Sequence, residues 1–153
     1  MKEVDVVEIV NDIIQVQING APKNTYFIAD IFNVIAMNNV NIDMISQMTL
    51  EEETRLGFTC KTSDQTNLNR AIDELTEKYP NINAVQNRTV AQVNVEGEGM
   101  KEATGVAAKL YKVIGNYNVP IHQVATSLTT ISFIMDSKDA KDVAEAIKIL
   151  YNL

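Results

Sequence analysis

The sequence predicts an α+β protein in which two similar small units share one chain of 153 residues. The first observation is an internal repeat, because residues 14–20 recur as 91–97 and residues 40–43 recur as 119–122, at offsets of about 77 and about 79 positions. The second observation is that strand and helix patterns follow these landmarks in the same order in both copies. One loop has therefore changed length while the order of the elements has been kept.

The first copy follows the order strand, helix, strand, strand, helix, strand. Its first strand, with alternating apolar and polar residues, ends at Gly20-Ala21-Pro22. The same patterns predict helices over 26–38 and from Ser63 or Asp64 to Tyr79, and strands over 42–48, 56–60 and 82–89. The helix residues predicted to face the core are Phe27, Ile28, Ile31, Ile35, Leu68, Ala71, Ile72, Leu75 and Tyr79. This order is typical of a four-stranded antiparallel sheet with both helices on one face, the ferredoxin-like arrangement.

The second copy lacks its fourth strand. Its pattern predicts strands over 91–95, 121–126 and 131–135, a helix striped by Val106, Leu110, Val113, Ile114 and Tyr117, and a last helix from Ser137 with Ala140, Val143, Ile147 and Leu150 inward. An open position would expose an unpaired strand edge, and residues 4–10 have the character of a strand that could fill it. We therefore predict a contiguous unit at 12–88, inserted into a discontinuous unit made of 1–11 and 89–153.

Composition restricts the classes of partner. The net charge is −7 and the 13 basic residues are scattered, which disfavours nucleic acid and anionic membranes as partners. No apolar stretch approaches the roughly 20 residues of a membrane span, and the first residues lack the apolar core of a signal peptide, so a cytoplasmic protein is expected. The single cysteine, Cys60, alternates with Leu56 and Phe58, which favours a packed, unreactive thiol.

The sequence contains no assembled catalytic residues, and we expect neither a metal nor a cofactor. His122 is the only histidine, which leaves little basis for a metal site or a catalytic triad. Gly97-Glu98-Gly99 lacks the third glycine of a dinucleotide fingerprint, and Glu51-Glu52-Glu53 is interpreted as a solvated hairpin tip. A small enzyme is thus the least favoured hypothesis.

A binding function is better supported by the loops after the first strand of each copy. The segments 23–26 and 102–105 each lead into a helix, whose first amide groups and dipole favour a carboxylate. Asn41-Ile42-Asp43 offers backbone groups and a carboxylate for an ammonium group. Together they suit a zwitterionic amino acid. The alternative is that both loops are only helix caps.

Some of these residues carry a family resemblance. Gly20-Ala21-Pro22, Ile31-Phe32 and the run 39–47 resemble the first regulatory ACT domain of aspartate kinases, and 95–100 with 105–108 is similar to the second. The resemblance implies a tandem ACT module that pairs with a second copy and binds lysine or threonine between one unit's loop and a neighbouring unit's strand. It also implies a kinase catalytic domain or subunit as partner, although nothing here resembles the Lys-Phe-Gly-Gly segment of that domain.

The resemblance also implies the residues of an effector site. They are Lys23, Asn24, Thr25, Tyr26, Phe27, Ile28, Asn41, Ile42, Asp43, Gln47, Asn118, Pro120 and Ile121. The chain departs from the family at Lys23 in place of Asp, at Thr25-Tyr26 in place of Pro-Gly, and at Pro120-Ile121-His122 in place of Asn-Ile-Glu. These departures leave an alternative open: a structural dimerisation module, or a free-standing ACT protein whose effector site has changed or decayed.

Overall fold

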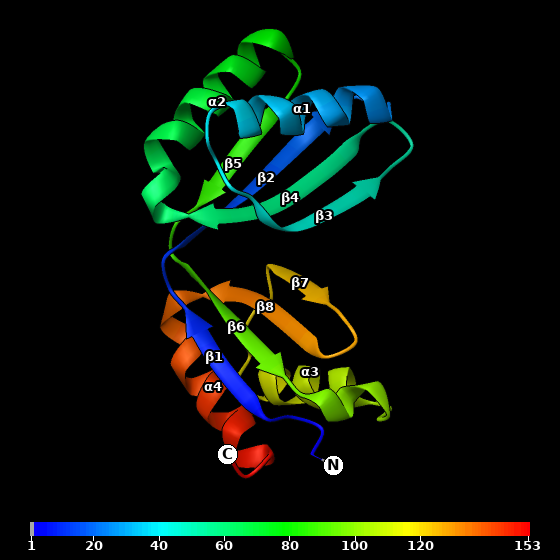
Figure 1. Cartoon of the computed structure of the whole chain (residues 1–153), viewed down its shortest axis with the longest axis vertical. Helices are drawn as coiled ribbons and strands as arrows, with labels where there is room; N and C mark the ends of the chain where they lie inside the picture. The colour runs from blue at the N-terminus through cyan, green and yellow to red at the C-terminus, as the bar shows by residue number, and fades with distance from the viewer. Residues whose placement is uncertain (1) are drawn as a thin grey trace. The chain divides into compact units, whose positions relative to one another are not determined.

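The computed structural model describes residues 2–153, which form two compact units (Figure 1). One unit is the contiguous segment Asp12–Arg88, here called the inserted unit. The other, called the split unit, combines the segment that ends at Asn11 with Thr89–Leu153. Each unit has its own four-stranded antiparallel sheet and its own hydrophobic core, so the α+β prediction of two ferredoxin-like units is confirmed.

The inserted unit has the strand order β3-β4-β2-β5, and α1 and α2 cover one face of its sheet (Figure 1). Its elements in chain order are β2 Ile13–Ala21, α1 Thr25–Met37, β3 Asp43–Thr49, β4 Thr54–Lys61, the 3-10 helix η1 Thr62–Asp64, α2 Gln65–Lys78 and β5 Asn83–Asn87. β2 is a central strand, hydrogen-bonded to both β4 and β5. β3 is an edge strand of this sheet, next to β4, and most of its side chains are exposed.

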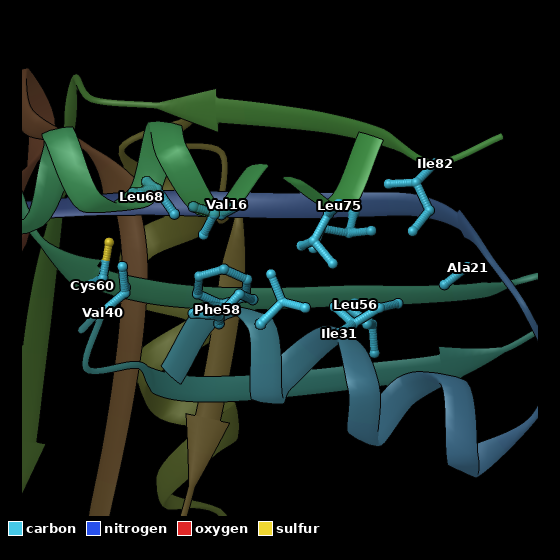
Figure 2. Packing of buried hydrophobic residues seen from close by; sticks show 14 of the residues in the cluster. Val16, Ala21, Ile31, Val40, Leu56, Phe58, Cys60, Leu68, Leu75 and Ile82 are labelled. Atoms are coloured by element: carbon cyan, nitrogen blue, oxygen red, sulfur yellow. The ribbon is translucent and has the colours of Figure 1, made fainter. Parts of the chain in front are cut away.

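Period-two alternation explains the core of the inserted unit. Ile14, Val16 and Ile18 on β2 are fully buried because every second side chain of a strand points to the same face. Ile31 of α1 and Leu68 of α2 close over them and are also fully buried. Figure 2 shows these helices meeting the strand side chains around Phe58.

The split unit has the strand order β1-β6-β8-β7. Its elements are β1 Val6–Val10, β6 Val90–Glu96, the 3-10 helix η2 Glu98–Lys101, α3 Val106–Asn116, β7 Gln123–Thr126, β8 Thr130–Asp136 and α4 Ser137–Leu150. β1 pairs antiparallel with β6, with Val7 opposite Val95. The N-terminal strand therefore supplies the fourth strand that the second copy lacks.

Residues before β1 pack tightly on the loop after β6. A Cβ atom added to Gly97 would lie 2.0 Å from the carbonyl oxygen of Glu3, and one added to Gly99 would lie 2.0 Å from that of Lys2. Val4 is fully buried, and the carboxylate of Glu3 pairs with the ammonium group of Lys109 on α3 at 3.0 Å. Only glycine leaves enough room for this segment.

The prediction that a side chain faces the core is wrong for three helix residues. Phe27 is 37% exposed, Tyr117 is 52% exposed and Leu150 is 44% exposed. All three lie in the first or last turn of a helix or at its cap, where a side chain has a neighbouring turn on one side only. Helical periodicity therefore assigned the face correctly in the middle of each helix and also at Val106, the first residue of α3, but not at these three positions.

Candidate functional site

The loop after β2 begins with a glycine in a left-handed conformation. Gly20 has φ +75°, and a Cβ atom there would lie 2.5 Å from the carbonyl oxygen of Asn81. The amide of Gly20 donates to Oε2 of Glu53 across 2.5 Å. Both the dihedral angle and the close approach require glycine, so the backbone at the base of the loop is fixed.

Asn24 caps the start of α1 and accepts hydrogen bonds from amides that were expected to bind a ligand carboxylate. Its Oδ1 accepts a hydrogen bond from the amide of Tyr26 at 2.8 Å. Its carbonyl oxygen accepts from the amides of Phe27 and Ile28 at 3.0 and 3.1 Å. A ligand carboxylate could accept a hydrogen bond from the Tyr26 amide only by displacing the Asn24 side chain.

The other predicted loop residues point in different directions. The ammonium group of Lys23 donates to the carbonyl oxygen of Glu51 across 2.8 Å. Thr25 and Tyr26 are exposed, Tyr26 by 76%, while Ile28 is buried in the core. The solvent-facing part of the loop is therefore made by Lys23, Asn24, Thr25 and Tyr26.

A cluster that the sequence did not predict supports the first turns of α1. The Phe27 ring meets the rings of Tyr26 and Tyr79 edge-on, with centroids 5.8 and 6.0 Å apart. Asp30 accepts a hydrogen bond from the Tyr79 hydroxyl at 2.5 Å and pairs with the ammonium group of Lys78 at 2.6 Å. The nearby Lys78, and then Tyr79, hold the pKa of Asp30 below its ordinary value. In the sequence, only the helical spacing of Phe27 and Asp30 indicated that these two members of the cluster lie close together.

The predicted strand residues lie on or just before the exposed edge strand β3. Asn41 and Gln47 are exposed, and Ile42 packs partly against the core. Asp43 is exposed, and its Oδ1 accepts a hydrogen bond from the amide of Met44 at 2.9 Å. Met44 has φ +48°, and the pairing with β4 shifts between Asp43 and Ser46, which marks a β-bulge. The local residue pattern does not predict this bulge.

The loop and Asp43 of one inserted unit lie at opposite ends of its sheet. Thr54 of β4 is opposite both Ala21 and Thr49, so the loop lies at the hairpin end of β3. Asp43 is opposite Thr59, five residues further along β4, which corresponds to about 17 Å of strand. A small amino acid cannot contact both groups within one inserted unit.

The remaining predicted residues belong to the split unit, in the connection between α3 and β7. Asn118 is exposed and has φ +54°, like its repeat equivalent Asn39 with φ +60°. Pro120 is exposed and Ile121 is half-buried. His122 follows them, with its Nε2 2.7 Å from Oδ1 of Asp136. The two copies thus end their first helix in the same way.

The loop before α3 differs from its counterpart before α1. Gly105, with φ +82°, is the N-cap residue of α3 and has no side chain that could cap the helix. The amide of Gly97 donates to the carbonyl oxygen of Thr129 at 2.9 Å, and Glu98 pairs with Lys101 at 2.8 Å. The expected helix start at 102–105 is thus present and lacks a side-chain cap.

The described residues offer little reactive chemistry. Burial, and then the charge of Asp64, raise the pKa of Cys60 to about 11, which fits an unreactive thiol. Among residues 2–153, no three histidine, cysteine or acidic side chains come together as a metal site would need. Within the same range, no helix has the length and apolar character of a membrane span.

Comparisons with known proteins agree with this architecture. Residues 93–150 match the model of the ACT domain family. The chain is 27% identical over 143 residues to Aspartokinase 2 of Bacillus subtilis (strain 168), which covers 94% of this chain and 35% of the relative. It is 28% identical over 140 residues to an aspartokinase of Helicobacter pylori (strain 26695), covering 91% of this chain and 34% of the relative. The chain thus spans about a third of the length of these relatives.

Solved structures show the same fold. The ligand-free regulatory subunit of aspartate kinase from Thermus thermophilus superposes with a TM-score of 0.87 at 24% identity, over 95% of this chain and 97% of that one. The aspartate kinase from Synechocystis gives a TM-score of 0.89 at 24% identity, over 99% of this chain and 27% of that one. Residues 93–150 thus match the ACT domain family, and the whole chain matches the regulatory part of aspartokinases and not their kinase domain.

Proposed function

We propose that this chain is an allosteric regulatory module of the aspartokinase type, which binds an amino-acid effector and transmits binding to a kinase catalytic domain or subunit. Lysine and threonine are the first candidates. One structural neighbour is an Escherichia coli aspartokinase III in complex with lysine and aspartate, and another contains aspartokinase alpha and beta subunits. The proposed role is regulatory, and we assign no catalytic residue to this chain.

The observation that carries the proposal is the separation of the two half-sites in the inserted unit. The loop at Lys23–Tyr26 lies at one end of β3 and Asp43 lies at the other. A second copy whose β3 runs antiparallel to the first would bring the Asp43 end of one strand to the loop end of the other. Such a pair would form two equal sites, each with a loop from one copy and a strand from its partner.

The exposed edge of β3 supports a pair of this kind. Ile45 is 55% exposed and Met48 is 60% exposed on a strand that has a neighbouring strand, β4, on one side only. A bare apolar edge strand favours association with another strand. We therefore propose a homodimer through the inserted units, with ACT domains bounded at 12–88 and at 1–11 plus 89–153.

In the proposed site, Asp43 holds the ammonium group of the effector and the loop faces its carboxylate. Asn41, Ile42 and Gln47 belong to the strand half-site, and Asn24 would yield the Tyr26 amide to the ligand. Phe27 and Ile28 support the loop from beneath. We propose that Asn118, Pro120 and Ile121 form the matching segment of the split unit, before β7.

A purely structural dimerisation module is the second candidate. It is favoured by the bonds that Lys23 and Asn24 already make to the protein. A thermal-shift screen of the amino acids separates the two functions. A rise of several degrees with lysine, threonine or another single amino acid supports regulation, whereas no rise with any of them favours the structural module. We also propose a cytoplasmic location, where a lone thiol such as that of Cys60 stays reduced.

A further inference from the structure

The loop after β2 is fastened to the tip of the β3–β4 hairpin. The amide of Gly20 donates to Oε2 of Glu53 across 2.5 Å, and the ammonium group of Lys23 donates to the carbonyl oxygen of Glu51 across 2.8 Å. Arg55 holds the Glu53 carboxylate in turn, with its Nε 3.0 Å from Oε1. The base of the loop and the hairpin tip are thus joined at two points.

The Glu53 carboxylate makes a charge-assisted hydrogen bond in this junction. An amide that donates to a carboxylate forms a stronger hydrogen bond than one that donates to a neutral carbonyl. Arg55 first, and then the Gly20 amide, hold the pKa of Glu53 below its ordinary value. Glu53 is therefore ionised at neutral pH, and the junction exists before any ligand binds.

The split unit makes the equivalent junction without a side chain. Gly97 is the repeat equivalent of Gly20, and its amide donates to the backbone carbonyl oxygen of Thr129 at 2.9 Å. Thr129 lies in the connection between β7 and β8, which corresponds to the hairpin tip of the inserted unit. The charged form of the junction thus occurs in the copy whose loop and strand we assign to the effector.

We propose that Glu53 is a positioning residue that couples the two half-sites of the inserted unit. β3 leads from Asp43 directly into the hairpin tip, so a change at the loop is transmitted to that strand through Glu53 and the Glu51 carbonyl. The inference rests on the proposed function, in which each site of a pair uses the loop of one copy and β3 of the other. Filling one site then changes the strand that serves the second site, and effector binding is cooperative.

The test compares Glu53→Ala and Glu53→Gln with Glu52→Ala, a matched control at an exposed neighbouring carboxylate of the same tip. Calorimetric titration with lysine and with threonine measures affinity and cooperativity. We expect Glu53→Ala to bind about tenfold more weakly and without cooperativity. Glu53→Gln, which keeps an acceptor for the Gly20 amide, should recover most of the affinity, and Glu52→Ala should match the unmutated protein.

Hydrogen exchange without effector gives a second, ligand-free readout. Glu53→Ala should speed exchange both in the loop at Gly20–Asn24 and along β3, while Glu52→Ala should change neither. Faster exchange confined to the loop would overturn the coupling, as would cooperative binding that survives in Glu53→Ala or non-cooperative binding by the unmutated protein. If the unmutated protein binds no amino acid, the proposed function fails, and the exchange result still decides whether Glu53 couples the loop to β3.

Discussion

The hydroxyl group of Tyr79 donates to Oδ2 of Asp30 across 2.5 Å and joins the end of α2 to the second turn of α1. The same carboxylate oxygen accepts the ammonium group of Lys78 at 2.6 Å. One carboxylate therefore fixes both helices of the inserted unit at the end where the proposed effector loop begins. Because the Phe27 ring packs on Tyr79, the junction also orients the first turn of α1.

Asp30 should make the inserted unit sensitive to acid. Its pKa in the folded protein lies below the ordinary value of 3.8, chiefly because of Lys78, so its stabilising effect is complete above that value. This contribution is lost as the pH falls through the lower folded pKa. We expect the urea midpoint to fall on acidification and to fall less in Asp30→Asn. Glu3 and Glu53, whose pKa values are also lowered, are present in both proteins and contribute equally to the fall. An equal fall of the urea midpoint in both proteins would therefore show that Asp30 makes no such contribution.

Gly97→Ala should destabilise the split unit. The new Cβ atom would lie 2.0 Å from the carbonyl oxygen of Glu3 and would displace the segment before β1. The expected loss is about 1 to 3 kcal/mol in the free energy of unfolding, measured with urea. Gly115→Ala is the matched control, because a Cβ atom there meets nothing within 4 Å, and alanine favours the α3 helix by up to about 1 kcal/mol. Similar stabilities for the two variants would contradict the prediction.

Deletion of the first ten residues should unfold the split unit preferentially. β1 would be lost, and β6 would become an edge with unpaired backbone groups and an uncovered Val95. Hydrogen exchange should show loss of protection in β6 and β8 while β2 and β4 of the inserted unit stay protected. Loss of protection confined to the inserted unit would refute this expectation.

Asp43→Ala should abolish the thermal shift produced by the effector, because the carboxylate is the proposed partner of the ligand's ammonium group. The protein without effector should lose little stability, since Asp43 is exposed and its side chain accepts a hydrogen bond from the amide of the adjacent Met44. Asp73→Ala, at an exposed carboxylate on α2, is the control and should keep the full shift. An undiminished shift in Asp43→Ala would remove this residue from the site.

Most of the fold followed from periodicity and from the cost of an unpaired edge. The alternation around Val16 and the missing strand of the second copy predicted the sheets, and the pairing of Val7 with Val95 is the contact that the missing strand required. The bulge at Met44 could not be predicted, because it depends on how β3 meets β4 and not on the local pattern.

The candidate site was harder to predict than the fold. The residues of the loop and of β3 could be named, and their assignment to the effector remains a prediction. Their separation by about 17 Å depends on strand register, which the sequence does not report. The cluster of Asp30, Lys78 and Tyr79 was missed because Asp30 lies 49 positions before Tyr79 in the chain.

The packing of residues 2–5 against the Gly97 loop has a topological consequence. In the inserted unit, Gly20 meets Asn81 and Ile82 of the connection between α2 and β5, and in the split unit Gly97 meets Glu3 and Val4 in the same way. The split unit is therefore a circular permutant of the inserted unit, cut between the end of α4 and β1. A linker from Leu153 to Lys2, with new chain ends opened between β5 and β6, would convert the molecule into two complete tandem repeats.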